Sequence, residues 1–370
     1  MFEFLKNKIF KSCKIFLIFI NRPFIFFVLF GLIFYNFMIS SYYVCNAEET
    51  IIPILTYHNF TKNESTDYQI NIQEFEKQMH YLVSNNYSII SLSELIIGLK
   101  DGKLPDNPVA ITIDDGYKST YTLAYPILKK YNIPATLFIY TDFIERNSAS
   151  LTWGEIREMM TSNIEIGSHT LSHCNLLHYK ENEEHDRYLS RIKKELALSK
   201  EIIENKTGKT VKFFAYPYGV YSSLVQDLAI EAGYLGTFNV NNMNNTINNN
   251  PKNLNRQIIF GNASFDAFIK KLKQEPLIIL KIFPEDGTVS HDQHIKIGAL
   301  LNDSNINENT LSLKLGGAKV NFIFNPENKE ISFAPRPDKP LIKKSYIVYV
   351  SAHDNNINCV RQTSWLITIK

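Results

Sequence analysis

The sequence predicts an α/β fold built on a parallel sheet, followed by a smaller all-β part. From about residue 51 to residue 280, short apolar runs rich in β-branched residues alternate with amphipathic helical patterns, which is the order of βα units. From about residue 283 only strand-like runs follow. A chain of 370 residues can hold one large barrel or open sheet and a small second domain.

The βα order rests on five strand-like runs, at 51–58, 109–113, 135–140, 164–166 and 211–215. Three helical patterns separate them: one marked by Phe75, Met79, Leu82 and Val83, one over 117–131, and one marked by Leu189, Ile192, Leu196 and Ile203. Whether the parallel sheet closes into a barrel or stays open is left undecided by this pattern.

The last part of the chain is predicted to be a small β-sandwich. Its strand-like runs are 294–301, 310–315, 319–324, 330–334, 345–352 and 365–369, separated by Asn-Pro, Gly-Gly and Asp-Asn turns. The pattern is loosely similar to the immunoglobulin-like modules of bacterial surface enzymes, for which spacing, wall attachment and glycan contact are all open roles. The expected domains are therefore 1–47, 48–282 and 283–370.

The amino-terminal segment predicts export. Five basic residues precede an apolar run at 23–40 that is long enough for a membrane anchor or the core of a signal peptide. Basic residues before this run and Glu48-Glu49 after it predict a cytoplasmic start. We therefore expect either a membrane-anchored protein with an extracellular catalytic domain, or a protein secreted after cleavage near Ala47.

Charge and cysteine content argue against a nucleic-acid-binding protein and against a disulfide-stabilised protein. Residues 1–47 contain five basic residues and one acidic residue, so the remainder carries a formal charge of −2, which gives no support for nucleic-acid binding. The four cysteines are too scattered to indicate a disulfide framework.

Two adjacent carboxylates, Asp114 and Asp115, come directly after the run at 109–113. An Asp-Asp-Gly sequence alone is more often a solvated turn. Adjacent side chains at a strand end face opposite ways, however, so one carboxylate can bind an ion while its neighbour acts as a base toward water.

Two histidines four residues apart, His169 and His173, follow the run at 164–166. The spacing places both imidazoles on one face if a helical turn follows, although a lone pair is about as often two unrelated surface histidines. Combined with the carboxylates, each after a strand, the pair predicts a hydrolytic metal site with about three protein ligands and an open position for water.

A third segment, Tyr216-Pro217-Tyr218-Gly219, follows the run at 211–215. Such a turn can present a backbone N–H to a substrate oxygen, whereas a packed aromatic turn is the simpler interpretation of this segment alone.

Together the three segments resemble the motifs of the polysaccharide deacetylase family, also called the NodB-homology group or carbohydrate esterase family four, over about residues 55–280. Residues 112–116 are similar to Thr-Phe-Asp-Asp-Gly, residues 168–173 to the family's histidine motif, and residues 217–219 to its Pro-Tyr-Gly. The resemblance implies a distorted, incomplete (β/α) barrel with its site at the carboxyl ends of the strands.

The resemblance also implies roles for the first two motifs. Asp114 would be the general base, while Asp115, His169 and His173 would bind a divalent metal. Zn²⁺ is the first expectation, and Co²⁺, Ni²⁺ and Fe²⁺ are alternatives for such a ligand set.

In the third motif, the resemblance implies that the backbone N–H of Tyr218 holds the oxyanion, with Tyr216, Pro217 and Gly219 near the substrate. The arginine that usually orients the base is missing from this motif. Arg256 is a candidate substitute at the substrate-binding side of the site, and a surface charge is an equally good interpretation of it.

The general acid is expected early in the chain. The family's late histidine has no counterpart, because the first histidine after residue 219 is His291, beyond the change in composition. Tyr57-His58 resembles the poly-N-acetylglucosamine deacetylase branch, where an early histidine serves as acid. The resemblance therefore implies this role for His58. Without the resemblance, a structural histidine would be the simpler interpretation of this residue.

The implied activity is metal-assisted hydrolysis of acetamido groups on an N-acetylglucosamine-containing cell-surface or cell-wall glycan. Poly-N-acetylglucosamine is favoured by the early Tyr-His, and peptidoglycan and chitin stay open. The rivals are an O-acetyl ester hydrolase on the same scaffold and a catalytically weak glycan-binding protein. Ten of the 17 residues from 239 to 255 are asparagine, which predicts a polar loop, with a substrate-rim role as the weaker alternative.

Overall fold

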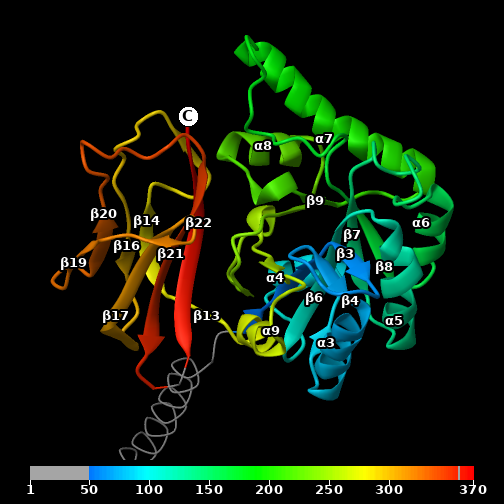
Figure 1. Cartoon of the computed structure of the whole chain (residues 1–370), viewed down its shortest axis with the longest axis horizontal. Helices are drawn as coiled ribbons and strands as arrows, with labels where there is room; N and C mark the ends of the chain where they lie inside the picture. Colours follow the sequence, from blue (N-terminus) through cyan, green and yellow to red (C-terminus); the bar gives the residue numbers. More distant parts are fainter. Residues whose placement is uncertain (1–49, 357–358) are drawn as a thin grey trace, which may run out of the picture. The chain divides into compact units, whose positions relative to one another are not determined.

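An eight-stranded parallel sheet forms the centre of the parallel-sheet part, residues 50–272, in the computed structural model, which describes residues 50–356 and 359–370 (Figure 1). The strand order is β10-β9-β8-β7-β6-β2-β12, and β5 pairs with the start of β6. The strands are β2 (Ile54–Tyr57), β5 (Ser88–Ile89), β6 (Pro108–Asp115), β7 (Ala135–Ile139), β8 (Ile164–Ser168), β9 (Phe213–Ala215), β10 (Gly236–Phe238) and β12 (Gln257–Ile258).

These strands are apolar on both faces because each face packs on its own cluster. Along β6, Ile111 and Ile113 belong to the large cluster shared with the helices, whereas Ala110 belongs to a smaller cluster with Phe138. Alternation along an extended strand puts Asp114 on the same side as Ala110. The strand pattern therefore directs this carboxylate to the inner side of the curled sheet.

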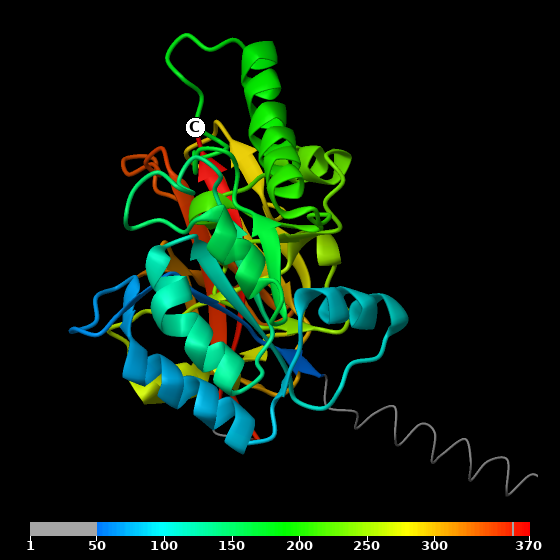
Figure 2. The same ribbon diagram turned by 90° about the vertical axis from the view of Figure 1, so that its right-hand side faces the viewer.

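Helices flank the sheet (Figures 1 and 2). They are α3 (Ile72–Ser84), α4 (Leu92–Asp101), α5 (Tyr125–Lys130), α6 (Trp153–Met159), α7 (His185–Thr207), α8 (Ser223–Glu231) and α9 (Phe265–Leu272). Helix α4 packs on the smaller cluster, and the others pack on the large cluster at the outer side of the sheet. The helix predicted at 117–131 begins instead with a π-helical turn, Thr120–Ala124, before α5. Pro126 has no N–H to donate into that preceding turn, which explains the departure.

The curled parallel sheet fits the predicted distorted, incomplete (β/α) barrel. Its edge strands β10 and β12 approach each other through the segment that precedes β12, because Phe238 and Leu254 form an isolated parallel bridge. Two short pairs lie outside the sheet: β1 (Ile51–Ile52) with β11 (Asn245–Thr246), and β3 (Asn59–Thr61) with β4 (Gln69–Asn71).

The all-β part, residues 275–370, contains two sheets that share one apolar cluster around Trp365. One sheet holds β13 (Glu275–Pro276), β15 (Thr288–Ser290), β17 (Ile306–Leu315), β18 (Ala318–Lys319), β21 (Ser345–Asp354) and β22 (Val360–Ile369). The other holds β14 (Ile279–Phe283), β16 (Ile297–Leu301), β19 (Ile323–Asn325) and β20 (Glu330–Phe333). The single strand predicted at 319–324 is thus two strands in different sheets. The immunoglobulin-like topology and the boundary at 282/283 stay predictions.

The predicted anchor or signal peptide at 1–47 lies outside the described residues. Within the described ranges, no helix combines the length and apolar character needed to cross a membrane.

Candidate active site

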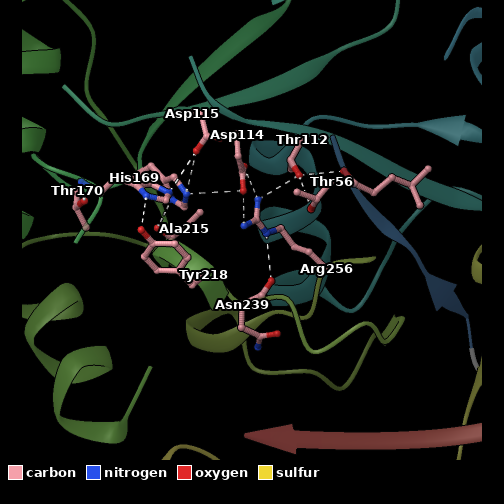
Figure 3. Close-up of polar contacts among 12 residues, drawn as sticks. Thr56, Thr112, Asp114, Asp115, His169, Thr170, Ala215, Tyr218, Asn239 and Arg256 are labelled. Atoms are coloured by element: carbon pink, nitrogen blue, oxygen red, sulfur yellow. Dashed lines mark hydrogen bonds and ion pairs between the residues drawn. The ribbon is translucent and has the colours of Figure 1, made fainter. Parts of the chain in front are cut away.

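The two carboxylates of the first motif end strand β6, in the middle of the parallel sheet (Figure 3). Asp114 is buried, and it lies on the inner side of the sheet. Asp115 has a left-handed backbone with φ of 80°. This backbone breaks the extended alternation of the strand, so both carboxylates reach one centre instead of facing opposite ways.

Asp115, His169 and His173 form a possible metal site. Each offers one ligand atom, and these atoms lie within 4.8 Å of one another. Asp115 Oδ1 is 3.3 Å from His173 Nε2 and 3.8 Å from His169 Nε2. The same oxygen is buried and receives no well-formed hydrogen bond from the described residues. A buried, unsatisfied carboxylate oxygen facing two imidazole nitrogens fits a divalent cation.

The imidazole of His169 is prepared to act as a ligand. Its Nδ1 is 2.7 Å from the carbonyl oxygen of Ala215, so Nδ1 carries the proton and Nε2 presents its lone pair to the centre. Burial lowers the pKa of His169 to about 4, and the ring is therefore neutral at physiological pH. His173 Nδ1 lies 3.3 Å from the hydroxyl oxygen of Tyr218.

The loop between the two histidines is irregular, so the helical turn on which the spacing argument depended does not form. Thr170 and His173 both have left-handed backbones, with φ of 73° and 59°. Glu195 of α7 accepts hydrogen bonds from the backbone N–H groups of Leu171 and Ser172, at 3.1 and 3.0 Å. These hydrogen bonds to Glu195, and not the hydrogen bonds of a helix, fix the loop and therefore both imidazoles.

Sequence reasoning missed Glu195, although a signal was present. It lies on the apolar face of α7 beside Ile192 and Leu196, and all three are buried. A carboxylate is almost never buried without a partner. Its position on the apolar face of the helical pattern therefore indicates that Glu195 accepts hydrogen bonds from nearby donors.

Arg256 forms a bidentate ion pair with Asp114. Its Nη1 and Nη2 donate to the two carboxylate oxygens at 2.7 and 2.9 Å, and its side chain is 0% exposed. Arg256 is therefore not a surface charge. Burial alone would raise the pKa of Asp114, but the charge and hydrogen bonds of Arg256 hold it below its usual value.

The asparagine-rich segment is mostly without regular structure, as predicted for a polar loop, but much of its first half is buried. Asn239, Asn241 and Asn245 are fully buried. The carbonyl oxygen of Asn239 accepts from Arg256 Nε at 3.2 Å. Asparagine side chains can serve as donor and acceptor at once: the amide of Asn239 donates to Asn253 Oδ1 and accepts from the N–H of Asn241, while its backbone carbonyl holds Arg256.

His58 follows strand β2, which lies beside β6 in the sheet. The register pairs Tyr57 with Ile113, so the next residues, His58 and Asp114, are opposite each other. The ring of His58 makes an edge contact with Tyr68, with centroids 5.1 Å apart. Its half-buried position at the strand end places an imidazole beside the carboxylate centre.

The third motif forms a short 3-10 turn, Pro217–Gly219. Tyr218 has a left-handed backbone with φ of 59° and a side chain that is 63% exposed. The side chain of Tyr216 is fully buried and donates its hydroxyl to Thr237, so it does not face a substrate. Pro217 and Gly219 are also buried, which leaves Tyr218 as the accessible residue of this turn.

Backbone strain is concentrated at this centre. Half of the twelve non-glycine residues with positive φ in the described chain are asparagine, which tolerates that conformation. The exceptions include Asp115, Thr170, His173 and Tyr218, all of which belong to the three motifs. Strained residues of this kind persist where the surrounding structure holds them, and they cluster at functional sites.

Comparisons with known proteins agree with this site. The sequence profile of the family described as polysaccharide deacetylase matches residues 101–236, which include both carboxylates, both histidines and Tyr218. His58 and Arg256 lie outside that match. The poly-β-1,6-N-acetyl-D-glucosamine N-deacetylase of Staphylococcus aureus (strain MRSA252) is 31% identical over 216 residues, covering 57% of this chain and 74% of the relative.

Solved structures also match. The Streptococcus pyogenes deacetylase PplD, in complex with acetate, is 26% identical with a TM-score of 0.54, covering 61% of this chain and 100% of PplD. IcaB from Ammonifex degensii is 24% identical with a TM-score of 0.52, covering 61% and 97% of the two chains, and it supports the fold. On its motifs, its fold and its relatives, this chain belongs to the polysaccharide deacetylase family.

Proposed function

We propose that this protein is an exported, divalent-metal-dependent N-deacetylase that acts on poly-N-acetylglucosamine or a related cell-surface glycan. The observation that carries the proposal is a carboxylate held by a buried arginine, Asp114 with Arg256, directly beside the cluster of Asp115, His169 and His173. The substrate follows from the name of the Staphylococcus aureus relative and from the early His58. Export follows from the apolar run at 23–40.

The metal ligands would be Asp115, His169 and His173. A divalent cation bound there, with Zn²⁺ as the first candidate, would polarise the acetyl carbonyl as a Lewis acid and lower the pKa of water. Asp115 brings a negative charge to this site and His169 brings a neutral nitrogen, and the side chains of both have little contact with solvent.

The chain's own groups would carry the proton transfers. Asp114 accepts a proton from the attacking water, whose oxygen bonds to the carbonyl carbon of the acetamide. The N–H of Tyr218 donates to the resulting oxyanion, a contribution of about 3 kcal/mol for such a donor. His58 protonates the nitrogen as the carbon–nitrogen bond breaks, a role worth about 10² to 10⁴ in rate. Acetate and a free amino sugar leave.

The test is product analysis of the purified protein with Zn²⁺ on poly-β-1,6-N-acetylglucosamine, chitin oligosaccharides and peptidoglycan. We expect acetate and free amines in equal amounts, with the highest rate on poly-N-acetylglucosamine. Acetate without new amines would show an O-acetyl esterase instead. Release of neither product, with retained glycan binding, would show a binding protein.

A further inference from the structure

Strand β22 of the all-β part contacts the asparagine-rich segment and Asp286 through part-buried hydrogen bonds. On β22, Ser364 Oγ donates to the carbonyl oxygen of Asn241 at 2.7 Å, and the N–H of Leu366 donates to Asp286 Oδ1 at 2.8 Å. Asp286 lies between β14 and β15. Its Oδ1 also accepts from the hydroxyl of Tyr221 at 2.5 Å, and its Oδ2 accepts from Asn253 Nδ2 at 3.1 Å.

Asp286 therefore joins donors from both parts of the fold. Leu366 belongs to the all-β part, whereas Tyr221 and Asn253 belong to the parallel-sheet part. Asp286 is half-buried, and a carboxylate that accepts several hydrogen bonds is costly to remove, because the donors it serves would lose their partner. Its placement makes it a junction between β22 and the asparagine-rich segment.

From this junction the contacts continue to the base. Asn239 Nδ2 donates to Asn253 Oδ1 at 2.9 Å, and the N–H of Asn241 donates to Asn239 Oδ1 at 2.8 Å. The carbonyl of Asn239 accepts from Arg256, which in turn holds both oxygens of Asp114. Each step is a direct hydrogen bond, and Asn239, Asn241 and Arg256 are fully buried.

We propose that Asp286 and strand β22 are positioning elements for catalysis: they fix the asparagine-rich segment, which fixes Arg256 on the carboxylate of Asp114. The inference rests on the proposed role of Asp114 as base. Two parallel N–H···O bonds set the orientation of a carboxylate as well as its charge. A shift of about 1 Å in a reacting group can cost about 10²-fold in rate. Loss of the contacts of Asp286 or β22 can therefore change kcat, although neither touches the substrate.

The first test compares Asp286→Asn with Asp303→Asn. Asp303 is a matched control because its carboxylate serves Arg361 and backbone donors within the all-β part. We expect Asp286→Asn to lower kcat about tenfold with KM within about twofold, and Asp303→Asn to leave kcat unchanged. Combined with Arg256→Lys, Asp286→Asn should cost less than the product of the two single effects, because both act on the same carboxylate.

A second test variant with its own control applies if Asp286→Asn does not fold. Ser364→Ala removes the bond to Asn241, while Ser345→Ala removes only a bond to Thr368 inside the all-β part. Only Ser364→Ala should lower kcat.

A readout without turnover separates this inference from the proposed function. The Nε–H signal of Arg256 in ¹⁵N NMR reports its bond to Asn239. We expect Asp286→Asn and Ser364→Ala to shift or broaden this signal, and the two control variants to leave it in place. The inference is overturned if both test variants match their controls in kcat and in the Arg256 signal. If the wild-type protein releases no acetate, the proposed function fails, and the NMR comparison still decides whether β22 positions Arg256.

Discussion

The pairing of Arg256 with Asp114 joins two residues 142 positions apart in the chain. Removing one partner of a buried ion pair leaves the other charge without compensation, which costs about 3–5 kcal/mol. We therefore expect the arginine to affect both the stability of the fold and the orientation of Asp114, the proposed base.

We predict that Arg256→Met lowers kcat at least tenfold and lowers the free energy of unfolding by about 3–5 kcal/mol. Arg256→Lys should be intermediate, because a lysine supplies the charge without the bidentate geometry. Steady-state kinetics and urea unfolding measure the two effects. Equal kcat values for the wild type and both variants would show that Asp114 does not depend on this contact.

The proposed role of Tyr218 in stabilising the oxyanion depends on its backbone N–H and not on its side chain. Tyr218→Phe keeps the N–H and the ring, and it loses only the contact between the hydroxyl and His173 at 3.3 Å. We therefore expect kcat/KM to fall by no more than about tenfold, the value of one ordinary hydrogen bond. A loss of several hundredfold in kcat/KM would instead assign a chemical role to the hydroxyl.

Single residues could be predicted from the sequence where a motif marks them. Asp114, Asp115, His169 and His173 are such residues, and the structure brings them together. The contact of Arg256 with Asp114 could only be proposed, because nothing local in the sequence around residue 256 shows that it reaches the inner side of the sheet. Proximity of this kind depends on the curvature of the whole sheet.

At the scale of elements, helix α7 supports the histidine loop through Glu195. We predict that Glu195→Gln weakens Zn²⁺ binding about 10- to 100-fold, the usual effect of losing an outer contact that orients metal ligands. Glu201→Gln, an exposed change on the same helix, is the control. Calorimetric titration with Zn²⁺ measures both, and equal affinities in the two variants would exclude this role for Glu195.

Helix α9 gives a prediction about pH. Burial lowers the pKa of Lys271 from 10.5 to about 8, so between these values the unfolded chain binds more protons than the folded one. Stability then rises with pH across this window. Lys271→Met should stabilise the protein below pH 8 by up to about 3 kcal/mol, and this advantage should disappear above pH 10.5. A constant difference in unfolding free energy from pH 7 to pH 11 would contradict the assignment.

The elements that the sequence predicted well are the buried parallel strands, because a continuous apolar run of five or so residues between turn signals is too short for a typical helix. The geometry of the histidine loop could not be predicted, since an i, i+4 spacing also occurs where left-handed residues and Glu195 shape the chain. Asparagine content predicted a polar loop at 239–255, but not that several of its side chains are buried and hydrogen-bonded. Composition does not show which polar groups find partners.

At the scale of the whole molecule, the proposed catalytic centre draws on five of the eight strands of the parallel sheet. His58 follows β2, the carboxylates end β6, His169 follows β8, Tyr218 follows the end of β9, and Arg256 precedes β12. The four positions at the ends of β2, β6, β8 and β9 are typical of barrels whose chemistry lies at the carboxyl ends of the strands, whereas Arg256 lies at the start of β12. This distribution means that the order of strands in space, more than their order in sequence, assembles the site.

The most direct test of the proposed catalytic centre separates metal binding from turnover. Asp114→Asn and His169→Ala are purified with Zn²⁺, and bound metal is measured by atomic absorption alongside acetate release from poly-N-acetylglucosamine. We predict that Asp114→Asn keeps about one metal ion per chain while its turnover falls by at least about 10², and that His169→Ala loses the ion. Full turnover in Asp114→Asn, or full metal content in His169→Ala, would contradict the assignment of base and ligands.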